Sequence, residues 1–237
     1  MRIDLGSSVQ CTDAVFGEIA DVIVDPISRR VTHLVVRPHD HHEGARLVPI
    51  DRVRPADDGV ALDYLVADVE ALDPLHESQY LRAGEQVVAD PDWDIGTQDV
   101  LALPVYQELN GMGSAIDPDP HVMVSYDRIP KHEVEIRRSS AVFSTDGHHL
   151  GHVEGFLVGE AQTADIVLER GHLWGRREVV IPAASVERVE NDSITLSLTK
   201  DQVGDLDVRH VHRWFWRPTG RERSGRCPTG RWRRRYR

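Results

Sequence analysis

Short runs of apolar, β-branched residues separated by turn residues fill most of this chain. Residues 19–24 form such a run, and Asp25-Pro26 interrupts it. Residues 60–66 and 194–198 alternate between apolar and polar positions. Alternation with a period of two is typical of strands that bury one face. The pattern therefore predicts a mainly β protein built from short strands.

The strand pattern occurs twice along the chain. Residues 17–25 have the same pattern as residues 151–159, at an offset of 134. The strand that ends in proline at residues 47–49 likewise matches residues 180–182. The offset drifts by only one or two residues, and it does so at turns, where insertions cost little. We therefore interpret the chain as two copies of one structural unit.

Each copy predicts a small closed sheet. Five or six short strands in about 60 residues, with no helix between them, indicate a small antiparallel barrel or roll, because closure removes the exposed edges. A short acidic helical turn is expected to end each copy, at residues 67–72 and 199–206, with Thr199 as the N-cap of the second.

The segment between the copies, about residues 73–139, is less regular. Thr97–Leu103 predicts a helix that Pro104 ends, because proline cannot continue a helix. Residues 121–126 and 133–136 alternate as strands do. The segment is too apolar to remain solvated, so we expect it to pack on one or both barrels.

These patterns divide the chain into four parts. Residues 1–75 and 137–208 are the two barrel-like domains, residues 76–136 are a connector with short strands and a helix, and residues 209–237 are a basic tail expected to be disordered. Domains of this size are close to the lower limit for a self-sufficient core. We therefore expect the barrels to pack together in pseudo-two-fold fashion, bridged by strands in 121–136. A homodimer formed through the same edges is the alternative.

Charge separates the tail from the rest of the protein. The formal charge of the 237 residues is −11, but the eleven arginines and one glutamate from Arg209 onward give +10, which leaves −21 on the body. An acidic body repels nucleic acid and anionic membranes, whereas the tail attracts both. Arginines interleaved with Trp214 and Trp216 suit phosphate contacts with base stacking, or an anionic membrane surface. Plain disorder and a shift of reading frame are the alternative explanations of the tail.

The sequence also indicates a compartment. No apolar run approaches the roughly 20 residues of a membrane helix, and the N-terminus lacks the apolar core of a secretory signal. Cys11 and Cys227, the two cysteines, form neither a disulfide framework nor a paired metal motif. We expect a cytoplasmic protein without a transmembrane segment.

Histidines supply the candidate metal site. The densest cluster among the 13 histidines is His39, Asp40, His41 and His42. Imidazole and carboxylate groups suit zinc, nickel or copper. Adjacent residues rarely converge on one ion without a second segment, so the favoured interpretation is a polar turn between two strands. A histidine-based metal or pH sensor is the alternative, because imidazole titrates near neutral pH.

Residues 171–175 occupy the equivalent loop of the second copy and place a tryptophan between glycines. A tryptophan in a loop can anchor a protein partner, or it can plug the open end of its own barrel. The candidate partner-binding residues are therefore His172, Trp174, Trp214 and Trp216.

Enzyme motifs are missing from the sequence. It contains no Gly-x-Ser-x-Gly elbow, no Walker loop and no Cys-x-x-Cys pair. Carboxylates occur throughout the acidic body, so their spacing selects none as catalytic. We expect a non-catalytic protein without a cofactor, with carboxylate chemistry as the enzymatic alternative.

The repeated pattern resembles the PRC-barrel domain. The resemblance rests on a glycine, a β-branched strand that runs through an acidic residue, a turn, a Leu-Val-Val strand and a Val-Pro strand, and it covers roughly residues 10–72 and 140–206. The second copy departs at Gly159, where the first has Asp25. PRC-barrel domains occur in the cytoplasmic part of the photosynthetic reaction-centre H subunit and at the C-terminus of a ribosome 16S-processing factor.

The resemblance implies a function without naming a partner. Its relatives dock onto larger assemblies, which implies a protein-interaction or scaffold module. The ribosomal relative and the arginine tail together favour, as an alternative, an RNA- or ribosome-associated factor that binds through the tail.

Overall fold

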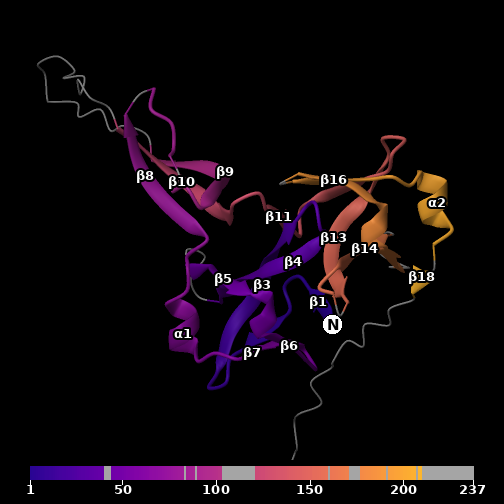
Figure 1. The fold of residues 1–237 in the computed structure, drawn as a ribbon, viewed down its shortest axis with the longest axis horizontal. Coiled ribbons are helices and arrows are strands. Elements are labelled where there is room, and N and C mark those ends of the chain that lie inside the picture. The colour runs from indigo at the N-terminus through magenta and orange to yellow at the C-terminus, as the bar shows by residue number, and fades with distance from the viewer. Residues whose placement is uncertain are drawn as a thin grey trace, which may run out of the picture.

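The protein is mainly β, and the residues that the structure describes form three sheets (Figure 1). A computed structural model describes residues 1–39, 44–82, 84–88, 90–102, 121–159, 161–170, 177–190, 192–206 and 208–209. In Figure 1 the first large sheet lies in the centre, the second lies beside it, and a three-stranded sheet extends from the opposite side of the first. The two α-helices among the described residues have five residues each, so neither is long enough to cross a membrane.

The first large sheet has the strand order β5-β4-β3-β2-β7-β6. Its strands are antiparallel neighbours, as expected for an antiparallel barrel or roll, except for β2 and β7, which are parallel. β5 and β6 are the edge strands of this order. Its elements are β2 (Ser8–Gln10), β3 (Val15–Asp25), β4 (Arg30–Pro38), β5 (Arg46–Pro49), the 3₁₀ helix η2 (Ile50–Arg52), β6 (Val53–Ala56), β7 (Gly59–Leu62) and α1 (Val66–Glu70).

The second large sheet repeats that order in its own strands, β15-β14-β13-β12-β17-β16. Its parallel pair, β12 and β17, is equivalent to β2 and β7. Its elements are β12 (Ala141–Phe143), β13 (His149–Val158), β14 (Ala164–Arg170), β15 (Arg177–Ile181), the 3₁₀ helix η3 (Ala183–Ser185), β16 (Val186–Glu190), β17 (Ser193–Leu196), α2 (Lys200–Gly204) and β18 (Val208–Arg209), which pairs with β15.

Local side-chain bonds explain how these elements begin and end. The Asp25 carboxylate accepts hydrogen bonds from the backbone N–H of Ile27 at 2.8 Å and from the Ser28 hydroxyl at 2.7 Å, which closes the turn from β3 to β4. In the second sheet Gly159 stands at this position, and its backbone closes a turn with Thr163 instead. Thr199 caps α2, where its hydroxyl accepts from the N–H of Gln202, as expected from the sequence.

The two large sheets exchange strands. β1 (Arg2–Asp4) precedes the first sheet in sequence but pairs with β13 of the second. β11 (Val134–Arg137) precedes the second sheet but pairs with β3 of the first. Gly155 permits the close approach of β1, because a Cβ atom there would lie 2.3 Å from the carbonyl oxygen of Ile3. Each large sheet is thus completed by the segment that leads into the other.

One hydrophobic core continues through both large sheets. It includes Val22 and Leu34 of the first sheet, Phe156 and Ile166 of the second, and Ile3 of the exchanged strand β1. All of these side chains are buried. Separating the sheets would expose apolar area on both, so the packing favours a single folded body.

The third sheet consists of β8 (His76–Arg82), β10 (His121–Pro130) and β9 (Trp93–Ala102), in that order. The helix expected at Thr97–Leu103 is wrong, because its described residues belong to β9 and pair with β10; Leu103 and Pro104 lie outside the described residues. Pairing with a neighbouring strand has overridden the local helical pattern. Of the strands expected to bridge the barrels, only β11 does so, whereas β10 pairs within the third sheet.

A small second core joins the third sheet to the first. Leu75, Ile129 and Trp93 pack against Ile23 and Val35. The backbone carbonyl oxygen of Leu75 also accepts a hydrogen bond from the N–H of Arg128 at 2.7 Å. These contacts fix the third sheet next to β3 and β11, where the charged residues described below converge.

Candidate functional site

A pocket of about 920 Å³ lies where the three sheets meet. Its walls come from β3 and β4, from β8, β9 and β10, from β11 and from β13, so all three sheets contribute. The volume is within the range of ligand-binding pockets in proteins, about 300–1,000 Å³. Its ionisable lining residues are Glu18, Asp21, Asp99, Asp127, Glu135, Glu154, Arg37, Arg137, Arg138, His76 and His152.

Arg137 connects two buried carboxylates at the centre of this pocket. Its Nε and Nη2 atoms donate to Glu135 Oε2 at 2.9 and 2.7 Å, and Nη2 also donates to Asp127 Oδ2. Asp127 and Glu135 are both buried. A buried carboxylate is costly unless it is paired, so Arg137 is required by both of its partners.

Asp127 has a second partner in His76 of the neighbouring strand. The Nδ1 atom of His76 lies 2.6 Å from Asp127 Oδ1, which accepts its hydrogen bond. This hydrogen bond raises the pKa of His76 above its ordinary value, although partial burial acts against the shift. The pair favours a positively charged imidazole in the folded protein, beside the Arg137 guanidinium.

Glu135 and Asp21 carry the charge that Arg137 does not fully neutralise. The side chain of Glu135 is 0% exposed, and its Oε1 atom has no hydrogen-bond partner. Burial raises the pKa of Glu135 to about 7, and the nearby Asp21 carboxylate adds to the shift. Burial also raises the pKa of Asp21 to about 6, while Arg137 and Arg37 act in the opposite direction. Both carboxyl groups therefore exchange protons close to neutral pH.

Strand register places Asp21 and Glu135 together. In the antiparallel pair β3–β11, Arg137 lies opposite Asp21, and Glu135 lies opposite Ile23. Side chains two residues apart on a strand share a face, so Asp21, Glu135 and Arg137 all lie on the side that the third sheet covers. The exchanged strand β11 thus brings two of the central charges to the first sheet.

The other two arginines of the pocket are also paired. Arg37 forms an ion pair with Glu18, and Arg138 forms one with Glu154 at 3.1 Å. The lining contains six carboxylates against three guanidinium groups and His76, whose raised pKa favours the charged imidazole, so the carboxylates outnumber these cationic groups by two. The pocket therefore favours cations over anions.

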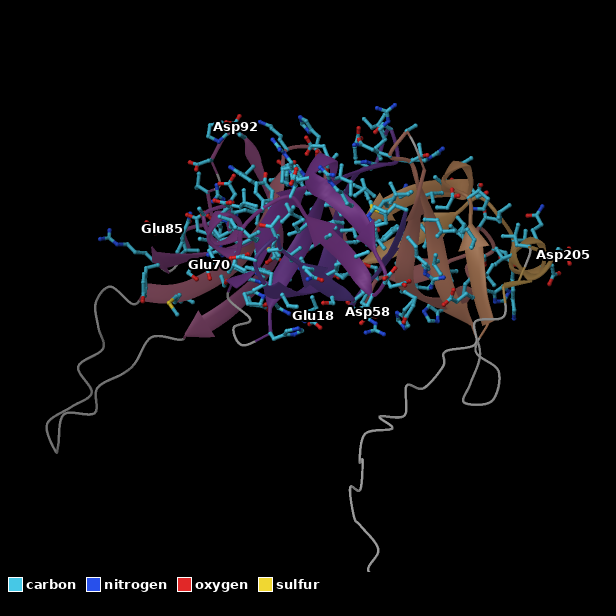
Figure 2. All side chains as sticks on the ribbon, turned by 90° about the horizontal axis from the view of Figure 1, so that it is seen from below. Glu18, Asp58, Glu70, Glu85, Asp92 and Asp205 are labelled. Atoms are coloured by element: carbon cyan, nitrogen blue, oxygen red, sulfur yellow. The ribbon has the colours of Figure 1, made fainter. Side chains whose placement is uncertain are left out.

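Acidic side chains are not confined to the pocket. Figure 2 shows them along the length of the molecule, from Glu85 and Asp92 at the third sheet, through Glu18 and Asp58 at the first sheet, to Asp205 after α2. What distinguishes Asp127 and Glu135 is their burial at a junction of sheets, because a buried charge interacts more strongly than an exposed one.

Most residues singled out by the sequence lie outside the described part of the chain. Of the histidine cluster, His39 is described, at the exposed end of β4, whereas Asp40, His41 and His42 are not. The proposed partner-binding residues His172, Trp174, Trp214 and Trp216 are not described either. Within the described ranges, no group of three or more histidine, cysteine or acidic side chains has a metal-binding arrangement. Cys11, the free cysteine of that part, is buried.

The sequence interpretation did not select the residues of the junction pocket. Asp21, Asp127 and Glu135 are three of 39 acidic residues, so composition could not distinguish them. A signal was nevertheless present, because each occurs within or beside an apolar, β-branched strand, where a charge is unusual. Charged residues inside strand patterns were therefore better candidates than the histidine-rich loops.

Two comparisons with known proteins found no relative of this chain. No protein-family model matches the chain, and no curated protein is similar to it at a significant level.

Proposed function

We propose that this protein is a non-catalytic interaction or scaffold module made of two PRC-barrel-type domains. Two observations support the domain assignment: the sequence pattern repeated at an offset of 134, and the identical strand order of the two large sheets. Such a protein binds its partner through the surfaces between and around its sheets, because buried side chains fill the core that the two large sheets share.

The observation that carries the proposal is the position of the pocket. It lies outside the shared apolar core, at the meeting point of three sheets, and its ionisable side chains come from strands distant in sequence. Binding sites occur preferentially at such junctions. We propose that a protein partner docks at this junction pocket. The cytoplasm is the compartment proposed for this interaction, and a homodimer remains an alternative use of the same surface.

The proposal is tested with matched variants of the full chain. Ser139→Trp places a large side chain in the pocket lining, whereas Ser197→Trp places the same side chain at an exposed position just after β17. Proteins captured by the unmodified chain are identified, purified and reconstituted with it. We expect Ser139→Trp to weaken the reconstituted complex at least about tenfold and Ser197→Trp to leave it unchanged. Complexes that tolerate Ser139→Trp would contradict docking at the pocket.

One observation favours acid–base catalysis as a second candidate. The His76–Asp127 pair has the geometry of a histidine oriented by a carboxylate, and His76 lines the pocket. Structural ion networks also shift pKa values, and here Arg137 is bonded to the same carboxylate. Turnover of an ester, amide or phosphoester that is lost in His76→Asn would establish this candidate in place of the binding module.

The remaining alternatives stay predictions from the sequence. An RNA- or ribosome-associated role depends on residues 209–237, and a metal or pH sensor depends on residues 39–42. Binding of RNA with a steep negative dependence on salt, abolished by deletion of the tail, would favour the first. Stoichiometric zinc, nickel or copper in the untagged protein would favour the second.

A further inference from the structure

The junction pocket contains negative charge that the protein does not neutralise with its own groups. Each of its three arginines is bonded to a carboxylate: Arg37 to Glu18, Arg137 to Glu135 and Asp127, and Arg138 to Glu154. The carboxylate of Asp21 forms no hydrogen bond or ion pair within the described ranges, and neither does Oε1 of Glu135. The unmatched carboxylate oxygens therefore lie on one side of the pocket, along β3 and β11.

A buried carboxylate oxygen without a partner is expensive for a folded protein. Such an atom loses its hydrogen bonds to water and gains none from the protein. Glu135 is buried and borders a pocket large enough to admit another molecule. A positively charged group bound in the pocket beside Asp21 would stabilise this buried carboxylate through its charge, without contacting the Oε1 atom itself.

The lining also indicates which kind of cation fits. In the described part of the chain, no three acidic or histidine side chains are arranged to hold a metal ion. A pocket of about 920 Å³ is far larger than a bare ion needs, and its lining includes the apolar residues Val35 and Leu75. Apolar walls next to carboxylates suit a cation on an aliphatic stem.

From these observations we infer that the junction pocket binds an organic cation, a primary ammonium or guanidinium group on an aliphatic chain, with Asp21 as its direct counter-charge. Glu135 acts as a second negative charge behind Asp21. This inference rests on the proposed interaction function and specifies the chemistry that the pocket recognises. The cation is either a lysine or arginine side chain of a protein partner or a free amine, and both present the same group.

The groups that face Glu135 determine how binding depends on pH. They are Asp21 on β3, Arg37 on β4, His76 on β8, Asp127 on β10 and Arg137 on β11. A bound cation favours ionised carboxyl groups, so it releases the protons that these groups hold near neutral pH. A protonated His76 also repels a cation, and its positive charge is lost as the pH rises. Binding should therefore strengthen as the pH rises from about 6 to 8.

Small probes test the inference on the full chain without a partner. Ethylguanidinium and butylammonium are titrated into the protein at pH 8 and followed by NMR shifts of the backbone amides, with butanol as the uncharged control. We expect saturable shifts at residues 18–21 and 135–139 with the cations and none with butanol. Asp21→Asn should weaken binding about tenfold or more, since it removes the direct counter-charge.

Two further variants and two ligands complete the test. Thr97→Lys adds an ammonium group to the pocket lining and should abolish binding, whereas Asp58→Asn removes an exposed carboxylate outside that lining and should change nothing. Tighter binding of an acetyl-Gly-Arg-Gly-amide peptide than of ethylguanidinium would assign the cation to a protein partner, and tighter binding of spermidine would assign it to a free amine.

The inference is overturned if no cation binds, if butanol binds equally well, or if Asp21→Asn and Thr97→Lys bind the probes as the unmodified chain does. None of these results would affect capture of a protein partner that is sensitive to Ser139→Trp, so the inference and the proposed function fail separately.

Discussion

Ile3 of β1 lies opposite Phe156 of β13, and both side chains are fully buried although they lie 153 positions apart in sequence. The first residues of the chain thus belong to the sheet formed by its last third. Met1 strengthens the attachment, because its backbone carbonyl oxygen accepts a hydrogen bond from the N–H of Val158 at 2.7 Å. In the other strand exchange, Ile136 of β11 lies opposite Val22 of β3.

Truncation of Ile3 should therefore destabilise the whole body. We expect Ile3→Ala to lower the free energy of unfolding by about 2–5 kcal/mol, since it leaves a cavity in the shared core. Ile27→Ala, the same substitution at a side chain that is 88% exposed, should change it by less than about 0.5 kcal/mol. Urea unfolding monitored separately over the two large sheets provides the measurement. Loss of stability confined to one sheet would contradict a single cooperative body.

The close approach of β1 to β13 predicts intolerance of a side chain at Gly155. A Cβ atom there would lie 2.3 Å from the Ile3 carbonyl oxygen, so Gly155→Ala must displace β1. At Gly159 the nearest atom to a new Cβ would be 3.5 Å away, which is an ordinary contact. We expect a loss of about 2 kcal/mol or more for Gly155→Ala and little change for Gly159→Ala, measured as midpoints of thermal unfolding.

Removal of the Arg137 guanidinium should strongly lower the free energy of unfolding. Arg137→Met leaves Asp127 and Glu135 buried without their guanidinium partner, which should cost about 3–5 kcal/mol. Arg54→Met breaks the ion pair with Asp63 at an exposed site and should cost less than about 1 kcal/mol. Denaturant unfolding measures both losses. If the two variants lose the same free energy of unfolding, the network around Arg137 stabilises the protein no more than an exposed ion pair does.

The raised pKa values predict a stability that falls as the pH rises. Between their ordinary values and their values in the folded protein, about 7 for Glu135 and about 6 for Asp21, the folded state holds protons that the unfolded state has released. This contribution is greatest at the acidic end of the window and is lost as the pH rises through the folded values. The raised pKa of His76 acts in the same direction.

The substitution Glu135→Gln isolates the contribution of Glu135 to this pH dependence of stability. We expect the unmodified chain to lose on the order of 3 kcal/mol of unfolding free energy between pH 5 and pH 8, and Glu135→Gln to lose clearly less. Glu70→Gln, at the end of α1, is the exposed control (Figure 2) and should follow the unmodified chain. A stability that rises over this pH range in the unmodified chain would rule out the assignment of raised pKa values.

Some of this architecture could be predicted from the sequence, because local patterns encode it. Period-two alternation and turn residues placed the strands around Ile19–Val24 and Ile194–Leu198, and Thr199 indicated the N-cap of α2. The helix expected at Thr97–Leu103 failed because its described residues pair with β10, and pairing with a distant strand is not visible in a local pattern. The exchange of β1 and β11 was hidden for the same reason, since it depends on contacts across more than 100 residues.

The candidate site was harder to predict than the fold. Asp21, His76, Asp127 and Arg137 come from four strands, and nothing in their spacing along the chain links them. Their common property is a charge close to buried apolar residues, which becomes visible only once the third sheet is placed over β3 and β11. The histidine-rich loops attracted attention because their residues are adjacent in sequence, and adjacency is a poor guide to convergence in a β protein.

An experimental structure of the full chain with ethylguanidinium at pH 8 tests the central claim most directly, namely that the junction pocket recognises an organic cation through Asp21. The account predicts the guanidinium group beside the Asp21 carboxylate, between β3 and the third sheet, and its loss from that position in Asp21→Asn. A cation bound only elsewhere on the acidic surface, or bound identically in Asp21→Asn, would contradict it.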